Sequence, residues 1–251
     1  MTHPRHRRGI VRILVSLAAI LLSTGCGRDS DTIYFGPGGG EKESIEFQDG
    51  SLPNSLYAGT RDAFLMDGPG LETVNFGLVP FDTVGLRLLT SNYYESRFII
   101  RMDVSLLTDC SEIVLAELHL HVDLPSADSL VFEAYEVTVP QVLPGTWLEG
   151  FDGQMNGVDW STADGTTGWD TEGGDLVGAP FDSATVKQDS VMIFEIPSAL
   201  AFRWIEEPNS NHGIVVRLVG TMPGEHIMVD TRESFPLYKR PRLLIEYIPG
   251  G

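Results

Sequence analysis

Three tryptophans in one long segment could form a surface that binds sugars. Residues 145–182 include Trp147, Trp160 and Trp169 together with nine Gly and eight acidic residues, and they contain no Lys, Arg or His. Flat indole rings offer a large contact area at a low entropic cost, which suits stacking on sugar rings. The alternative is that the rings are buried and fix the segment to the fold. Gly and Asp surround Trp160 and Trp169, so these two are the candidates for sugar contact.

The same segment carries oxygen ligands that suit calcium. Ca²⁺ takes about six to eight oxygens from carboxylates, amides and backbone carbonyls. Residues 152–157 resemble the first half of an EF-hand loop, but Ala163 stands where the closing acid would be, and no helical pattern flanks the run. A solvated acidic loop is the simpler interpretation. The alternative is a calcium site of another kind, formed by some of Asp152, Asn156, Asp159, Asp164, Asp170 and Asp175.

Two histidines form a second candidate site. His119 and His121 are two residues apart, so they share one face of the strand expected there, with Glu117 and Asp123 beside them. Imidazole and carboxylate groups in this arrangement could bind a divalent metal ion. No third ligand can be named from the sequence, and two ligands rarely make a tight site. We therefore interpret these residues as the polar side of an alternating strand.

Two arginines on another expected strand allow two interpretations. Arg97 and Arg101 lie on the side opposite the apolar residues Phe98, Ile100 and Met102. An arginine paired with a carboxylate could hold strand edges together by bidentate hydrogen bonds. Alternatively, Arg97 and Arg101 could contact sugar hydroxyls.

Catalysis has little support in the sequence. There is no Gly-x-Ser-x-Gly elbow, no His-Glu-x-x-His and no P-loop. Cys110 has acidic neighbours rather than the basic ones that activate a thiol. We therefore expect no enzymatic activity, although any two of the 35 acidic residues could face each other as in a glycoside hydrolase.

Alternating apolar residues predict the strands that must position these groups. The expected strands are residues 84–89, 98–104, 114–122, 130–139, 190–196, 213–220 and 243–248. Only residues 198–206 suggest a helix, so a parallel sheet, whose crossovers need helices, is disfavoured. We predict an all-β fold: one jelly-roll-like antiparallel β-sandwich over residues 56–251, interrupted by residues 145–182 as one long Gly/Asp/Trp-rich loop.

The N-terminus has the pattern of an export signal. Four arginines precede an apolar run over residues 13–22, and Ser-Thr-Gly-Cys follows it. Residues 21–26 resemble a bacterial lipobox, with Ser23 where Leu is usual. We predict a signal peptide over residues 1–25, acylation of Cys26, and a flexible tether over residues 26–55. Gly27 follows Cys26, and a non-acidic residue at this position of bacterial lipoproteins goes with sorting to the outer membrane. By this resemblance the expected location is that membrane or the cell surface.

The charge excludes one class of partner. The chain has 17 Lys+Arg against 35 Asp+Glu, a formal charge of −18, and removal of the four signal-peptide arginines would make it −22. Nucleic-acid binding needs clustered Lys and Arg, so it is not expected. An anionic polysaccharide would also be repelled, which makes a neutral polysaccharide the better candidate. Membrane contact is expected through the lipid anchor only.

Taken in chain order, these segments resemble the DNRLRE domain family, also grouped as carbohydrate-binding module family 96. The resemblance spans about residues 61–247 and departs from the family pattern at Met102, at Asp159 and in the expected exposed pair His119 and His121. The matching pieces are Asp62 to Leu65, Asn75-Phe76-Gly77, Arg97 to Ser105, Trp147 to Gly150, Trp160, Trp169, Gly173 to Asp175, Trp204, Asn211 to Ile214 and Pro241 to Leu243. The resemblance implies a non-catalytic jelly-roll module of secreted and surface proteins, often joined to carbohydrate-active enzymes.

The sequence therefore predicts a surface-anchored, non-catalytic lipoprotein that binds polysaccharide. The alternative is a structural or adhesive envelope protein that uses the sandwich as a spacer. Exposure of the tryptophans distinguishes the two: an indole reachable beside a groove favours sugar binding, whereas burial of every tryptophan favours the spacer.

Overall fold

A computed structural model describes residues 40–250, apart from residues 90, 124, 128, 152–155, 188, 189 and 221. The predicted signal peptide and Cys26 lie outside the described residues. Within the described part, the strands pair in antiparallel fashion and helix is scarce, so the predicted all-β fold is confirmed. The jelly-roll order of strands remains a prediction. No helix among the described residues has the length and apolar character needed to cross a membrane.

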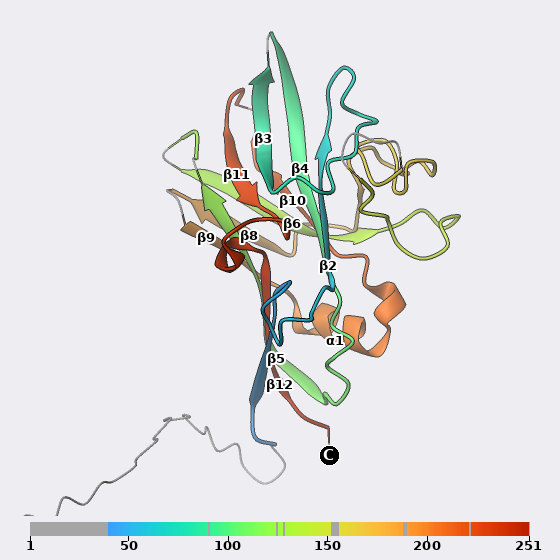
Figure 1. Ribbon diagram of the computed structural model, residues 1–251, viewed down its shortest axis with the longest axis vertical. Helices are drawn as coiled ribbons and strands as arrows, with labels where there is room; N and C mark the ends of the chain where they lie inside the picture. Colours follow the sequence, from blue (N-terminus) through green and yellow to red (C-terminus); the bar gives the residue numbers. More distant parts are fainter. Residues whose placement is uncertain are drawn as a thin grey trace, which may run out of the picture. The chain divides into compact units, whose positions relative to one another are not determined.

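The strands belong to one extended hydrogen-bonded network (Figure 1). Its main path runs β1-β12-β5-β11-β3-β4-β10-β6-β7, while β2 pairs with β4, β8 with β6 and β9 with β5. The elements are β1 (Glu43–Phe47), β2 (Thr60–Met66), β3 (Phe81–Leu89), β4 (Asn92–Met102), β5 (Glu112–Asp123), β6 (Leu130–Thr138), β7 (Asp175–Leu176), β8 (Asp182–Val186), β9 (Ser190–Glu195), α1 (Ser198–Glu206), β10 (Ile214–Leu218), β11 (His226–Asp230) and β12 (Arg242–Ile248). Two 3₁₀ turns, Pro208–Ser210 and Leu237–Lys239, complete them.

The main core follows from the period-two pattern. Every second residue of β5, from Ala116 to Val122, is buried, and so are Phe98 and Ile100 of β4. These side chains meet in one cluster, and α1 adds Trp204 to it while packing against β5. Because successive side chains point to opposite faces of a sheet, the other face of each strand is left to interact with something else.

Several strands are apolar on that second face as well. Leu65 of β2, Ile99 of β4 and Val215 of β10 are all fully buried, although they point away from the main core. Strands buried on both faces have continuous apolar runs instead of alternation, which is what Ala-Phe-Leu-Met, Phe-Ile-Ile and Ile-Val-Val show in these strands. A further layer must cover them, and the described residues within 145–182 supply it.

The predicted tether is wrong from residue 43 onward. Glu43–Phe47 form β1, which pairs with β12, and Phe47 is fully buried in the main core. After β1, the carboxylate of the buried Asp49 accepts a hydrogen bond from the backbone N–H of Thr60 at 2.9 Å. The Glu-Ser-Ile-Glu-Phe run has the alternation of a strand, and this pattern outweighs the glycines before it.

Candidate functional site

All four tryptophans are buried. Trp147, Trp160 and Trp169 are 3%, 5% and 7% exposed, and Trp204 is 4% exposed. The first three form a second apolar cluster with Leu65, Ile99, Val215 and other residues of the sheet. Their segment lies beside β2 in Figure 1, in yellow. Of the two alternatives raised by the sequence, burial of the rings is confirmed, and exposure of Trp160 and Trp169 as platforms for sugars is wrong, because their rings cover the apolar outer face of the sheet.

Hydrogen bonds fix the buried indoles in place. The Trp147 Nε1–H donates to the backbone oxygen of His212 at 2.7 Å, and the Trp169 Nε1–H donates to that of Asp159 at 3.0 Å. Gly173 allows a close approach: its φ is +79°, and a Cβ there would lie 2.6 Å from Arg97 Nη1 and 2.8 Å from the Trp160 ring. Only glycine fits this position without strain.

Several acidic residues of the loop accept hydrogen bonds within its own turns. Both carboxylate oxygens of Asp159 accept hydrogen bonds from Ser161 or Thr162, and Asp164 does the same for Thr166 and Thr167. The Asn156 side-chain oxygen accepts one from the Phe151 N–H, the Asp175 carboxylate accepts one from the Thr171 N–H, and Asp170 is exposed. These carboxylates do not converge in a group of three among the described residues, and Asp152 lies outside them. Calcium binding by this loop remains a prediction.

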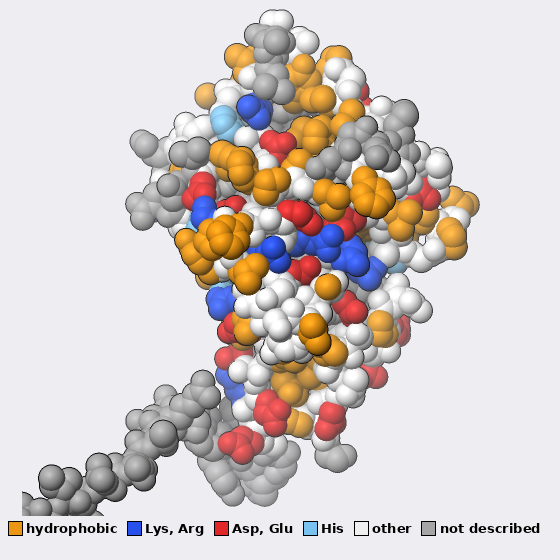
Figure 2. All heavy atoms as spheres, in the orientation of Figure 1, with side chains coloured by type: hydrophobic (Ala, Val, Ile, Leu, Met, Phe, Trp, Pro, Cys, Tyr) orange, Lys and Arg blue, Asp and Glu red, His pale blue; other side chains and the backbone are white. Residues whose placement is uncertain are grey.

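An ionic cluster links the loop to the sheet, with buried carboxylates around a partly exposed arginine. Arg232 Nε lies 2.8 Å from Glu149 Oε1 and 2.7 Å from Glu233 Oε1, and its Nη1 lies 3.6 Å from Asp49 Oδ2. The backbone N–H of Arg232 donates to the fully buried Asp62 at 2.9 Å, and the Asp62 N–H donates to Glu149 at 3.0 Å. Figure 2 shows a band of Lys and Arg flanked by Asp and Glu across one face. One arginine thus connects three separate chain segments.

Two carboxylates of this cluster, Glu149 and Asp62, have raised pKa values. Burial raises the pKa of Glu149 to about 7, and nearby Glu233 adds to the rise while Arg232 opposes it. Burial also raises the pKa of Asp62 well above its usual value, again with a contribution from Glu233. Desolvation disfavours the charged form of each acid, and the shared arginine offsets only part of this cost.

A hollow of about 430 Å³, lined by both charged and apolar side chains, lies on the part of the outer face that the loop leaves open. It is lined by Glu95 and Arg97 of β4, Glu133 of β6 and Arg217 of β10. Arg97 donates to Glu95 at 2.7 Å and to the backbone oxygen of Gly173 at 2.9 Å, with its guanidinium 4.6 Å from the Trp160 ring centre. The buried Trp160 ring therefore packs under the Arg97 guanidinium group and holds it in place.

The second arginine of the hollow is held in the same manner. Arg217 Nη2 donates to the Tyr135 hydroxyl at 2.7 Å, its guanidinium lies 4.7 Å from the Tyr135 ring centre, and that hydroxyl donates to Glu133 at 2.6 Å. Each arginine thus lies on an aromatic ring and beside a glutamate. Cation–π contact and ion pairing together hold both guanidinium groups in defined positions.

An exposed aromatic residue continues the same face. Tyr93 lies four residues before Arg97 on β4, so its side chain points to the same side of the sheet, about 13 Å away along the strand. It is 53% exposed and stands opposite Leu88 of β3, which is 49% exposed. Arg101, by contrast, lines a separate hollow of about 260 Å³ with Asp103 and Asn211. Arg97 and Arg101 therefore do not form one surface.

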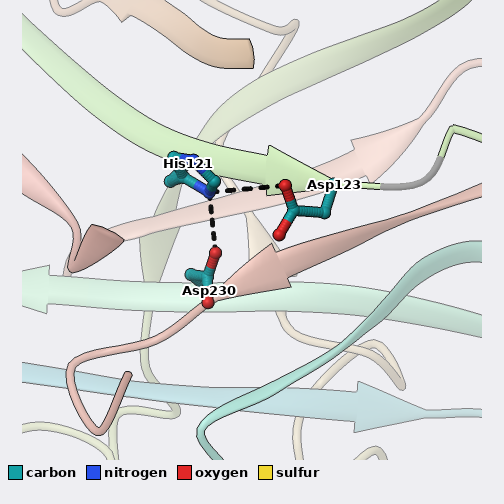
Figure 3. A group of neighbouring side chains, drawn as sticks. All are labelled: His121, Asp123 and Asp230. Atoms are coloured by element: carbon teal, nitrogen blue, oxygen red, sulfur yellow. Dashed lines mark hydrogen bonds and ion pairs between the residues drawn. The ribbon is translucent and has the colours of Figure 1, made fainter. Parts of the chain in front are cut away.

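The histidine pair is not simply solvated. His119 Nε2 lies 2.9 Å from Glu117, and His119 Nδ1 accepts from Arg242 at 3.0 Å. His121 Nδ1 lies 2.7 Å from Asp230 Oδ2 and 3.9 Å from Asp123 Oδ1 (Figure 3). Asp230, the third group missing from the sequence interpretation, comes from β11, a strand that the sequence did not predict. A hollow of about 260 Å³ is lined by His119 and His121.

No family model matches this chain, and no curated protein matches its sequence. The resemblance to the DNRLRE family remains a prediction from the motifs alone.

Proposed function

We propose that this chain is a non-catalytic, lipid-anchored module of the bacterial cell envelope that binds a neutral polysaccharide. The binding surface in this proposal is the hollow between Arg97 and Arg217, extended by Tyr93. It is not the tryptophan loop, as we name the segment of residues 145–182. The observation that carries it is the pair of arginines, each held by an aromatic ring and a glutamate at the open end of the outer face.

The chemistry of the hollow suits sugar hydroxyls. A hydroxyl both donates and accepts hydrogen bonds, and the hollow offers guanidinium donors beside carboxylate acceptors. Two arginines and two glutamates balance in charge there, although the whole chain is strongly acidic. A neutral ligand is therefore not repelled locally. Tyr93 adds an exposed ring against which the apolar side of a sugar could stack.

Binding to a panel of neutral and anionic glycans tests this proposal. We expect a neutral glycan to bind, and we expect Arg217→Met and Tyr93→Ala each to reduce its affinity. Tyr238→Ala and Arg203→Met are matched controls, because these residues are also exposed but lie outside the hollow. Equal losses in the controls, or binding that is unchanged in Tyr93→Ala and Arg217→Met, would contradict the assignment of the hollow.

A structural or adhesive spacer is the second candidate, and one observation favours it. Burial of all four tryptophans removes the platforms expected of a sugar-binding loop, and three of them form a packed layer that covers the sheet. A spacer needs such rigidity and no groove. If no glycan in the panel binds the wild-type protein, this function replaces the first. In both proposals export and acylation of Cys26 place the protein at the envelope, which fractionation of a Cys26→Ser variant would test.

A further inference from the structure

We propose that His121, Asp123 and Asp230 form a binding site for a divalent transition-metal ion such as Zn²⁺. In the metal-free protein the ammonium group of Lys239 holds the cation position. This site lies on β5 and β11, separate from the hollow assigned to glycan, and it does not depend on the glycan proposal.

The three side chains converge from two strands. One ligand atom from each of them lies within 4.8 Å of the other two. Zinc bonds of about 2.0–2.2 Å in tetrahedral geometry place ligand atoms about 3.3 Å apart. The distances from His121 Nδ1 to Asp230 Oδ2, 2.7 Å, and to Asp123 Oδ1, 3.9 Å, lie on either side of that value. Small rotations of the side chains drawn in Figure 3 would close the site.

The structure already places a positive charge between the two carboxylates. Lys239 Nζ lies 2.6 Å from Asp123 Oδ2 and 3.5 Å from Asp230 Oδ2. Two carboxylates that share one ammonium group can share a divalent ion in the same place, because their charges would balance it. The Lys239 side chain is 24% exposed, so it can turn into solvent when displaced.

The donor set favours zinc over calcium. Imidazole nitrogen is a ligand for Zn²⁺, Ni²⁺ and Cu²⁺, whereas Ca²⁺ takes only oxygens and needs more of them. A hydrogen bond from Ser234 Oγ at 2.8 Å orients Asp230 through its other oxygen. Outer contacts of this kind fix the ligand geometry in protein metal sites. Three protein ligands leave a fourth position, which the adjoining hollow of about 260 Å³ can supply with water or a small anion.

Titration of the full chain with Zn²⁺ by calorimetry, and with Co²⁺ by visible absorption, tests the site. We expect one ion per chain, and we expect Asp230→Asn and Asp123→Asn each to weaken binding by at least about tenfold. Lys239→Met is the sharpest variant. It should bind Zn²⁺ about five- to tenfold more tightly, because no ammonium group then has to be displaced.

His226→Ala and His119→Ala serve as matched controls, and both should retain the wild-type affinity. His226 is on β11 outside the group, and the ring nitrogens of His119 are engaged by Glu117 and Arg242. Circular dichroism of each variant checks that it folds. The proposal is overturned if the wild-type chain binds no Zn²⁺ below millimolar concentration, if Lys239→Met binds no more tightly, or if His119→Ala abolishes binding while Asp230→Asn does not.

Discussion

Two sheet surfaces point away from the main core, one on β2, β4 and β10 and the other on β5 and its neighbours, and they differ in what covers them. The face made by β2, β4 and β10 carries Leu65, Ile99 and Val215 and is covered by the tryptophan loop. The face made by β5 and its neighbours carries Glu117 and His119 and has no such cover among the described residues. The difference follows the sequence: apolar outward side chains are covered by the loop, whereas polar outward side chains can remain in contact with water.

Trp160→Ala should give the largest effect on this comparison. Removing a buried indole leaves a cavity between loop and sheet, and we expect the free energy of unfolding to fall by about 3–5 kcal/mol. Ile193→Ala on the open face is the control, because this side chain is 43% exposed and should cost about 0.5 kcal/mol. Urea denaturation measures both. Similar small losses in the two variants would mean that the loop is not a packed layer.

The buried acids predict an unusual dependence of stability on pH. The pKa of Glu149 rises from 4.5 to about 7 on folding. Between these two pH values the folded state therefore holds a proton that the unfolded state has lost. Stability from this group is therefore greatest below pH 4.5 and is lost as pH rises towards 7, by at most about 3 kcal/mol.

Glu149→Gln should flatten this dependence between pH 5 and pH 8, because the variant side chain has no charge to bury. Glu172→Gln, an exposed acid of the same loop, should leave the curve unchanged. Urea denaturation at several pH values checks both variants. A wild-type protein that gains stability steadily from pH 5 to pH 8 would contradict the burial of Glu149.

Gly173→Ala separates crowding from backbone strain. Both Gly173 and Gly178 have positive φ, +79° and +64°, but a Cβ at Gly178 would meet no atom within 4 Å. Gly178→Ala should cost about 1 kcal/mol from strain alone, and Gly173→Ala about 2 kcal/mol, since it also displaces Arg97 or Trp160. Thermal unfolding of the pair measures the difference. Equal costs would show that loop and sheet do not meet closely at Gly173.

The smallest effect is expected on the open face. Glu117→Gln removes a partly exposed partner of His119 and should change the free energy of unfolding by about 0.5 kcal/mol or less. Urea denaturation measures it. A loss above about 2 kcal/mol would mean that this face is as tightly organised as the covered one.

The period-two pattern predicted most of the fold, but it missed the weaker signals. The strands around β4 and β5 and the helix at residues 198–206 follow directly from apolar spacing. Strands β8 and β11 escaped because Asp-Ser-Ala-Thr-Val and His-Ile-Met-Val-Asp hold fewer apolar residues than the equally short β10, which was found from its unbroken Ile-Val-Val run. The runs Phe98-Ile99-Ile100 and Val215-Val216 carry a further signal. Unbroken apolar residues indicate a strand that is buried on both faces, and therefore a layer that covers its second face.

The candidate sites were harder to predict because they combine distant residues. Arg97 was found from the sequence, but Arg217 and Glu133 join it only through the pairing of β10 with β4 and β6. Asp230 meets His121 through the pairing of β11 with β5. Such register depends on which strands become neighbours, and one sequence does not specify that order.

Quenching of tryptophan fluorescence by acrylamide tests the central claim, that the loop is a packed layer with its indoles shielded. With all four rings at most 7% exposed, we predict weak quenching of the native protein and a large increase after unfolding in urea. Native quenching as strong as that of the unfolded chain would show that water reaches the indoles, and the covered face described above would not exist.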